Sequence, residues 1–597
     1  MSDKLDNYRR GDAAVVGPNR LWPLYAAGFD NLGVDGRPIE APLPACGPDE
    51  LLVRHDACGL CFSDIKVINL GQNHPRIFRD IQQEPIVLGH EVAITVVGVG
   101  EKLADQYKVG DRFIIQAEIY KDGVNYAYGY MIQGGLSKYG LADQRVLNGD
   151  HGVYLIPVQP GTGYAESALT EPWACVTAAY GLTYRTGLKP GGMTWVIGVP
   201  PPIPPRARGG GYTLSAGFDE HSHPARLILM NVPGPFGSWL RERAAALGIQ
   251  TSEVSETSEV SVPVDDIILL GADPDLIEAA SPHLADFGVF AIIVADPLLG
   301  TDRPLPRKVN VDVGRVHYNR WVYVGGTGPD IADAYRALPV RSALKPGGRA
   351  WFIGAAGPMG RMHVQRAIQV ADCPATIVCT DVSDLRLNDL AESYAAEAAA
   401  RGIEFICLNP MNKAAYEEGM ARFGPPPPSL PPLRQGEERG AGFDDVVVLA
   451  PAPALIAEGA TWLAERGVMN VFAGVARGAI AALDLSDAYL RQTRVIGHSA
   501  SSIDDLRFML FQAETGTLSP NRSVAAIGSL DAARKGLMAV KDQVYPGKIV
   551  IYPHIKPLPL TALPDLKGVL PSVYAKLKYG REWTNEAEAE LLRVMLE

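Results

Sequence analysis

The sequence predicts an α/β protein that also contains a separate β domain. Residues 51–120 hold short apolar runs separated by Gly and Asp, a pattern typical of a small barrel or sandwich. Residues 188–514 alternate β-branched runs with amphipathic stretches, which indicates βαβ units around a doubly wound parallel sheet. This second pattern occurs twice, and 597 residues are too many for one hydrophobic core. We therefore expect several structural units.

Composition limits the kinds of partner and compartment. A net charge of −12 argues against nucleic acid as a bulk electrostatic partner. The sequence has no apolar run that predicts a membrane span, and its first residues lack the apolar core of a secretory signal. Seven cysteines in so long a chain indicate free thiols in a reducing compartment. We expect a cytoplasmic protein with a small-molecule partner, no nucleic acid, no membrane and a possible homo-oligomer.

Two short motifs predict a metal site. In ACGLCFSDIK (57–66), Cys61 stands just before a short turn, and in LGHE (88–91), His90 and Glu91 follow an apolar run. A thiolate, an imidazole and a carboxylate are all ligands of zinc, and a catalytic zinc keeps one coordination position open. The motifs therefore predict a catalytic zinc.

Sequence motifs in and around this region resemble those of a known family. FSDIK, GHEVAITVVGVGE, VGDRFIIQAEIY and QGGLSKYG resemble the zinc-dependent medium-chain dehydrogenases, and more narrowly their sorbose-1-phosphate reductase and polyol dehydrogenase branch. The resemblance implies a GroES-like catalytic domain and a Rossmann domain for a nicotinamide cofactor. It also implies hydride transfer between that cofactor and a secondary alcohol or ketone of a polyol, sugar or sugar phosphate.

The resemblance assigns roles to further residues. Glu171, in the motif TEPW, matches a glutamate beside the metal, which binds it directly or through water; the alternative is a helix-entry residue stabilised by the helix dipole. Ser63 matches the hydroxyl that takes the alcohol proton, and Asp64 holds a ligand or backbone in place. Where many relatives have a relay histidine, this chain has Lys66. Lys66 is expected to pass the proton, contact the cofactor or bind a substrate phosphate.

Cysteine spacing sets the expected number of metal ions. Cys58 and Cys61 form one C-x-x-C pair, but no second pair exists, and no cysteine lies between Gly110 and Cys175. A redox pair is the alternative to the metal site. We predict one catalytic zinc, with Glu91 or Glu171 as the carboxylate ligand, and no structural zinc.

The central part of the chain is an internal repeat. LKPGGMTWVIG (188–198) recurs as LKPGGRAWFIG (344–354), and two further blocks recur in the same order. The fold class is therefore α/β plus β, with a GroES-like catalytic domain and a duplicated Rossmann region. We expect four segments: a catalytic domain with linking helix (1–187), a degenerate Rossmann module (188–343), a cofactor-binding module (344–514), and a return to the catalytic domain followed by a surface appendage (515–597).

The second module carries the predicted cofactor loop. Its first strand runs into AAGPMG and then a helix, where missing side chains and free N–H groups suit a pyrophosphate. The next strand ends in Asp381, which suits the ribose hydroxyls of NAD and repels a 2′-phosphate. Arg386 follows shortly, so NADP stays open. The predicted cofactor residues are Gly354, Gly357, Pro358, Met359, Gly360, Asp381 and Arg386.

The first module lacks these features. A proline-rich segment at 199–211 replaces the loop, and Asn231 stands where Asp381 is expected; a displaced loop at 232–237 is an alternative. We predict that this module imitates a partner subunit, because relatives dimerise through the edges of their Rossmann sheets. The late strands, 320–326 and 493–499, would then be neighbours across a pseudo-two-fold axis.

The sequence leaves alternatives for phosphate binding and for the function itself. Arg54, Arg76 and Arg79 lie near the predicted metal motifs and are candidates for binding a substrate phosphate, although arginines are also common on solvated faces. The functional alternative to the enzyme is a non-catalytic or regulatory relative that uses the doubled Rossmann region for binding or assembly. The complete ligand set and the one intact phosphate loop favour the enzyme.

Overall fold

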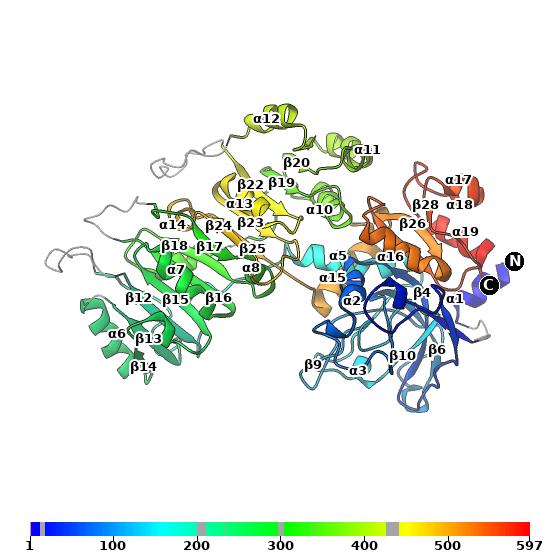
Figure 1. The fold of residues 1–597 in the computed structure, drawn as a ribbon, viewed down its shortest axis with the longest axis horizontal. Coiled ribbons are helices and arrows are strands. Elements are labelled where there is room, and N and C mark those ends of the chain that lie inside the picture. Colours follow the sequence, from blue (N-terminus) through cyan, green and yellow to red (C-terminus); the bar gives the residue numbers. More distant parts are fainter. Residues whose placement is uncertain are drawn as a thin grey trace. The chain divides into compact units, whose positions relative to one another are not determined.

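The computed structural model describes residues 2–11, 18–199, 211–232, 234–295, 304–338, 341–424 and 441–597, shown in Figure 1. They form two compact units. The first consists of Met1–Thr177, Gly357–Gln369 and Ala500–Glu597, and the second of Ala178–Ala356 and Val370–Ser499. Most of the proline-rich segment at 199–211 and all of 425–440 lie outside the described residues.

An eight-stranded sheet organises the first unit. Its order is β11-β7-β6-β4-β27-β26-β28, and β10 pairs with β4. Its strands are β4 (Leu51–Gly59), β6 (Glu91–Val99), β7 (Arg112–Ile115), β10 (Tyr139–Ala142), β11 (Leu155–Pro157), β26 (Val524–Ser529), β27 (Lys548–Tyr552) and β28 (Thr561–Ala562). Three small ribbons pair β1 (Asn19–Leu21) with β3 (Ile39–Ala41), β2 (Pro23–Leu24) with β5 (Ile86–Val87), and β8 (Tyr120–Lys121) with β9 (Val124–Asn125).

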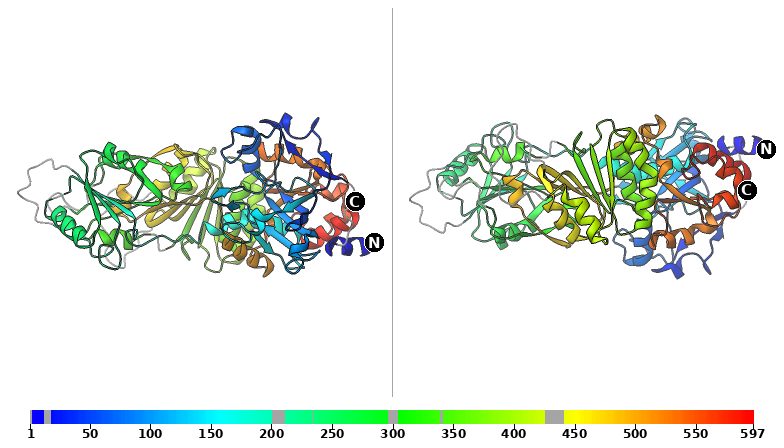
Figure 2. Two further views of the ribbon diagram at one scale, coloured as in Figure 1. Left: turned by 90° about the horizontal axis from the view of Figure 1, so that it is seen from below. Right: turned by 90° about the horizontal axis from the view of Figure 1, so that it is seen from above.

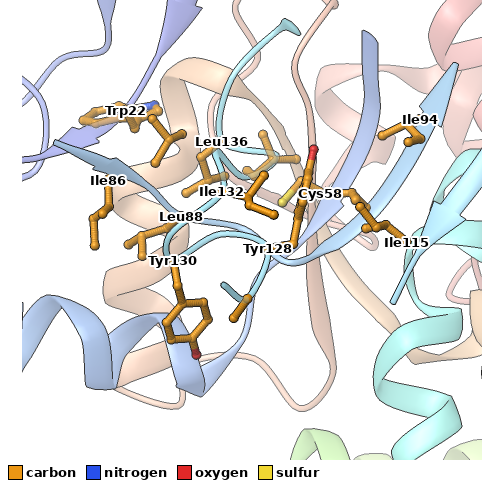
Figure 3. Packing of buried hydrophobic residues seen from close by; sticks show 14 of the residues in the cluster. Trp22, Cys58, Ile86, Leu88, Ile94, Ile115, Tyr128, Tyr130, Ile132 and Leu136 are labelled. Carbon is orange, nitrogen blue, oxygen red and sulfur yellow. The ribbon is translucent and has the colours of Figure 1, made fainter. Parts of the chain in front are cut away.

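The helices of the first unit surround this sheet. They are α1 (Ser2–Arg9), α2 (Phe62–Leu70), α3 (Gln144–Leu147), α4 (Tyr164–Ala168), α5 (Thr170–Ala178), α10 (Pro358–Gln369), α15 (Ile503–Glu514), α16 (Ala533–Lys541), α17 (Leu566–Val569), α18 (Pro571–Tyr574) and α19 (Asn585–Met595). Figure 3 shows part of the core, where Trp22, Cys58 and Tyr128 are almost fully buried. This core fixes the ends of β4 and β6, from which the predicted metal ligands extend.

The C-terminal segment differs from expectation. Glu588 on α19 is only 4% exposed. It accepts hydrogen bonds from the backbone N–H groups of Tyr164 and Ala165, at 2.5 and 2.7 Å, and from the Tyr552 hydroxyl at 2.8 Å. The prediction of a surface appendage is wrong, because a buried carboxylate of α19 satisfies backbone donors at the start of α4.

The second unit contains two six-stranded parallel sheets with the same topology. Their orders are β14-β13-β12-β15-β16-β18 and β21-β20-β19-β22-β23-β25, and each reads 3-2-1-4-5-6 along its own copy, the order of a dinucleotide-binding Rossmann sheet. The first copy has β12 (Met193–Gly198), β13 (Arg226–Met230), β14 (Gln250–Glu253), β15 (Val264–Leu270), β16 (Leu284–Ile293), β17 (Val309–Asp312) and β18 (Val322–Gly326). The second has β19 (Arg349–Ile353), β20 (Thr376–Thr380), β21 (Glu404–Leu408), β22 (Phe443–Val448), β23 (Leu463–Val471), β24 (Ile480–Leu483) and β25 (Arg494–Gly497).

Helices and ion pairs repeat as well. The first copy has α6 (Gly234–Ala246), α7 (Pro274–Ala280), α8 (Val313–Tyr318) and α9 (Ile331–Arg336), and the second has α11 (Asp384–Ala400), α12 (Lys413–Ala421), α13 (Pro453–Thr461) and α14 (Ser486–Leu490). An Arg185–Asp266 ion pair in the first copy corresponds to Arg341–Asp445 in the second. The predicted fold class is confirmed: a GroES-like domain accompanies a duplicated Rossmann region.

The two copies, green and yellow in Figure 2, lie side by side, and their contacts are approximately two-fold symmetric. Strands β17 and β24 occupy equivalent places in the two copies and pair antiparallel, with Asn310 opposite its counterpart Ala482. On either side of this point, α8 of the first copy packs on β25 and α14 of the second packs on β18. One hydrophobic core contains residues of both copies. Each copy therefore covers the sheet edge of the other.

The late strands are neighbours, as predicted, but they do not join the two sheets. β18 and β25 contact each other, and yet the two six-stranded sheets share no ladder in the described residues. Residues of α14 and α8 lie close to the ends of β18 and β25, respectively. A Cβ on Gly325 would meet Tyr489 Cβ at 2.7 Å, and one on Gly497 would meet Val316 O at 2.6 Å. The shared ladder is instead formed by β17 and β24.

The contact between the copies yields a stability prediction. Gly314, in α8, faces the second copy so closely that an added Cβ would meet Ala476 O at 2.1 Å. Gly→Ala ordinarily stabilises a helix, but here we expect Gly314→Ala to destabilise the protein by about 1–3 kcal/mol through overpacking. Urea unfolding measures this. Gly328→Ala is the control, because a Cβ there meets nothing within 4 Å, and an equal effect of both variants would contradict the prediction.

Among the helices of the described residues, none has the length and apolarity needed to traverse a bilayer.

Candidate metal and cofactor sites

Strand register brings the predicted metal ligands together. Gly59, at the end of β4, lies opposite Glu91, at the start of β6. Cys61 follows Gly59 by two residues and His90 precedes Glu91 by one, so both reach the same corner of the sheet. Gly59 leaves room for the Glu91 side chain, because a Cβ there would lie 2.1 Å from Glu91 Oε2.

Asp64 fixes two of the ligands. This buried carboxylate accepts hydrogen bonds from the backbone N–H groups of Cys61 at 3.0 Å and Gly89 at 3.3 Å. It also lies 3.4 Å from His90 Nδ1, which leaves Nε2 as the ring nitrogen for a metal. Burial alone would lower the pKa of His90, but the Asp64 carboxylate raises it well above its usual range.

Three potential metal ligands form a compact cluster. The Cys61 sulfur, one ring nitrogen of His90 and one carboxylate oxygen of Glu91 lie within 4.8 Å of one another. Glu91 Oε2 is buried and makes no hydrogen bond within the described residues. Such an atom is costly unless a cation or donor compensates it. The donor set and this oxygen without a hydrogen bond both fit zinc.

Glu91 has a partner that the sequence reasoning missed. Its Oε1 atom accepts a hydrogen bond from Lys548 Nζ, on strand β27, which is separated from β6 by β4. Glu91 is fully buried and Lys548 is only 4% exposed. Burial by itself would lower the pKa of Lys548, but Glu91 raises it above its usual value. The ammonium group therefore holds one Glu91 oxygen and offsets its charge. The only local signal was a lysine opening the apolar strand KIVIY.

Glu171 lies near the cluster but is not one of its three members. Burial raises the pKa of Glu171 to about 7; the His90 charge opposes the rise, and Glu91 adds to it. Cys175, one helical turn later, was also not assigned. Burial raises its pKa well above the usual range, and Glu171 adds to the rise. A cation at the cluster would offset the cost of charging Glu171. Glu91 and Glu171 thus both remain candidate carboxylate ligands.

Helix α2 places Ser63 and Lys66 differently. Ser63 is half-buried in the first turn, two residues after Cys61. Lys66 is exposed one turn later. Burial lowers the pKa of His74, and the charges of Arg76 and Lys66 lower it further.

The predicted phosphate loop follows β19. Gly354 has a φ of 81° and donates its N–H to Thr380 O at 2.8 Å. A Cβ there would meet Ala450 at 3.2 Å. Gly357 precedes α10, whose first three residues are Pro358, Met359 and Gly360. Proline suits this position, because the first N–H of a helix has no intrahelical partner.

Asp381 lies just after β20 and contacts the loop. Its Oδ2 accepts the Ala356 N–H at 3.3 Å, and its Oδ1 accepts the Ser383 N–H at 3.1 Å. Arg386 Nη2 donates to the same Oδ1 at 2.8 Å. Asp381, the predicted ribose acceptor, is therefore already paired with Arg386, whose positive charge reduces the expected preference for NAD over NADP.

Comparison with known proteins agrees with this arrangement. Residues 47–154 match the alcohol dehydrogenase GroES-like domain. The chain is 24% identical over 326 residues to an L-sorbose 1-phosphate reductase from Klebsiella pneumoniae, covering 51% of this chain and 75% of the relative. The predicted resemblance to the zinc-dependent medium-chain dehydrogenase superfamily is confirmed. The predicted resemblance to its polyol dehydrogenase branch is confirmed, and the protein is an oxidoreductase of the alcohol dehydrogenase type.

Two relatives match this dehydrogenase over nearly its whole length. A mannitol-1-phosphate 5-dehydrogenase from Aliivibrio fischeri is 23% identical over 562 residues, covering 92% of this chain and 93% of the relative. The uncharacterized protein YggP from Escherichia coli K12 is 23% identical over 560 residues, covering 92% of both chains. The similarity to both therefore extends across the duplicated region of the dehydrogenase.

Proposed function

We propose that this dehydrogenase transfers a hydride between a nicotinamide cofactor and a secondary alcohol or ketone of a polyol, sugar or sugar phosphate. One zinc per chain is held by Cys61, His90 and a carboxylate of Glu91 or Glu171. The observation that carries the proposal is the Cys61–His90–Glu91 cluster, in which the buried Glu91 Oε2 makes no hydrogen bond within the described residues. When bound, zinc supplies a Lewis acid for the substrate oxygen, and the nicotinamide supplies the hydride acceptor or donor.

The protein's own residues hold the ligands and move the proton. Asp64 orients His90 and the start of α2 through its contacts with both ligand segments. Lys548 fixes one oxygen of Glu91. Ser63, beside Cys61 in the first turn of α2, takes the proton of the substrate alcohol. Lys66 is exposed, and it passes that proton on, contacts the cofactor or binds a substrate phosphate.

Only the second Rossmann copy is proposed to hold the cofactor. Gly354 and the start of α10 supply the backbone that approaches the pyrophosphate. Asp381 supports a preference for NAD, because a carboxylate accepts from ribose hydroxyls and repels a 2′-phosphate. Its pairing with Arg386 leaves NADP as the weaker cofactor.

A combined metal and activity measurement tests the proposal. Purified protein from zinc-supplemented cells is analysed for metal and assayed with a panel of polyols and their phosphates, using NAD and NADP. We expect one zinc per chain and NAD-dependent turnover of at least one secondary alcohol. Absence of both zinc and turnover would instead support the binding or assembly relative.

A further inference from the structure

We propose that His74 and Arg76 form a subsite for a phosphate monoester of the substrate. The substrate class is then a phosphorylated polyol or its ketose phosphate. This inference rests on the proposed function, because the subsite is defined by its position next to the metal cluster.

Tyr130 connects the subsite to the metal cluster. Its ring centroid lies 6.2 Å from that of His90 and 5.5 Å from that of His74, and the Arg76 guanidinium lies 5.8 Å from it. Tyr130 is 6% exposed, and Figure 3 shows it beside Leu88. A single aromatic ring thus separates a predicted zinc ligand from the basic residues. A substrate whose hydroxyl meets the metal therefore has its distal end within reach of them.

The hydrogen bonding of His74 makes it a donor. Its Nδ1 atom accepts the backbone N–H of Arg76 at 3.2 Å, so the proton of the neutral ring is on Nε2. Burial lowers the pKa of His74, and the charges of Arg76 and Lys66 lower it further. A phosphate dianion would therefore interact favourably with the charges of Arg76 and Lys66 and would favour the protonated form of the imidazole.

Arg76 is held in place without being saturated. Its Nη1 atom pairs with Glu118 Oε1, and Glu118 Oε2 accepts from Asn125 Nδ2 at 2.5 Å. Glu118 thus fixes one side of the guanidinium, while Nη2 and Nε make no further hydrogen bond within the described residues. The Arg76 side chain is 40% exposed, and a planar guanidinium with unused N–H groups suits bidentate phosphate binding. Lys66 and Arg76 together exceed the charge of Glu118 by one.

The other two candidate arginines are engaged elsewhere. Arg54 is almost fully buried, donates to Asp56 at 2.7 Å and stacks over Tyr8. Arg79 donates to the backbone carbonyls of Met131 and Pro85, at 3.3 and 3.5 Å. Of the three arginines predicted as phosphate candidates, the geometry selects Arg76.

Steady-state kinetics on paired substrates test the subsite. For His74→Asn and Arg76→Gln we expect KM for a polyol phosphate to rise about 10- to 100-fold, as for a lost hydrogen bond to a charged group. KM for the matching unphosphorylated polyol should stay within about two-fold of the wild-type value, because the lost contacts involve only the phosphate. Lys102→Gln, an exposed lysine 3.8 Å from Asp49, is the charge control and should change neither. Equal losses on both substrates would overturn the proposal.

A binding measurement separates this proposal from the proposed function. Inorganic phosphate is titrated into the zinc-loaded protein and followed by phosphorus NMR. The wild type and Lys102→Gln should bind it, and His74→Asn and Arg76→Gln should bind it at least about ten-fold more weakly. Absence of turnover with every alcohol, together with this pattern, would refute the proposed function and leave the anion site. Unchanged phosphate binding in both variants would refute the subsite, whatever the activity.

Discussion

Replacing Cys61 with serine is expected to remove zinc and abolish turnover. Replacing a residue that only supports a metal ligand lowers metal affinity or activity by about 10- to 100-fold. Loss of the thiolate ligand itself should therefore lower kcat/KM by more than about 10²-fold. The neighbouring ligands are poorly suited to hold the ion alone, because Glu91 is partly engaged by Lys548. Metal analysis of the purified variant, with kcat/KM measured in parallel, provides the result.

Cys46→Ser is the matched control for this experiment. Cys46 is exposed and lies in the same unit, away from the metal motifs in sequence, so its replacement should leave zinc content and activity unchanged. Full zinc content in Cys61→Ser would refute the metal site.

The same assay distinguishes the two carboxylates. If Glu91 is the ligand, Glu91→Gln loses zinc and Glu171→Gln retains it; if Glu171 is the ligand, the pattern reverses. Glu91→Gln also leaves Lys548 buried without its counter-ion, so thermal unfolding of the variant accompanies the metal measurement. Retention of zinc by both variants would mean that neither carboxylate is a ligand.

Replacing Asp381 with alanine is expected to weaken NAD binding by about 10- to 100-fold, the loss of one or two hydrogen bonds to ribose. NADP binding should weaken less or improve, because the carboxylate that repels a 2′-phosphate is gone and the Arg386 ion pair with Asp381 is lost. Nicotinamide fluorescence titrations of both reduced cofactors measure the two dissociation constants.

Two companion measurements sharpen this result. Asp381→Asn keeps the shape of the side chain and removes its charge, so it should relieve the repulsion of NADP with a smaller loss of NAD binding. Calorimetry should give one cofactor per chain, since the prediction assigns binding to the second copy alone. A stoichiometry of two, or equal weakening of both cofactors in Asp381→Ala, would contradict it.

The sequence alone was sufficient for features that are encoded locally or by repetition. The motifs around Cys61 and His90 contain ligand types at a recognisable spacing, and the structure brings these residues together. The duplication predicted two parallel sheets, because similar patterns of apolar residues bury similar faces. Asp381 was placed at the phosphate loop by counting along a βαβ unit, and its bond to Ala356 agrees with that placement.

Other features depended on contacts between distant segments. Lys548 reaches Glu91 only because β27 lies beside β4 in the sheet, and strand order is not written in either strand. The burial of Glu588 likewise depends on α19 meeting α4. The helical spacing of Ala587, Leu591 and Leu592 indicates one buried face of α19, but it does not indicate which element that face meets.

The relation between the two copies shows the same division. The sequence determined that two similar modules exist and that their late strands are candidates for an interface. Only the tertiary structure decided that β17 and β24 form the shared ladder while β18 and β25 stay separate. The close approach of Tyr489 to Gly325 and of Val316 to Gly497 is a property of packed surfaces. Because packing depends on side chains from both copies at once, neither copy's sequence specifies it alone.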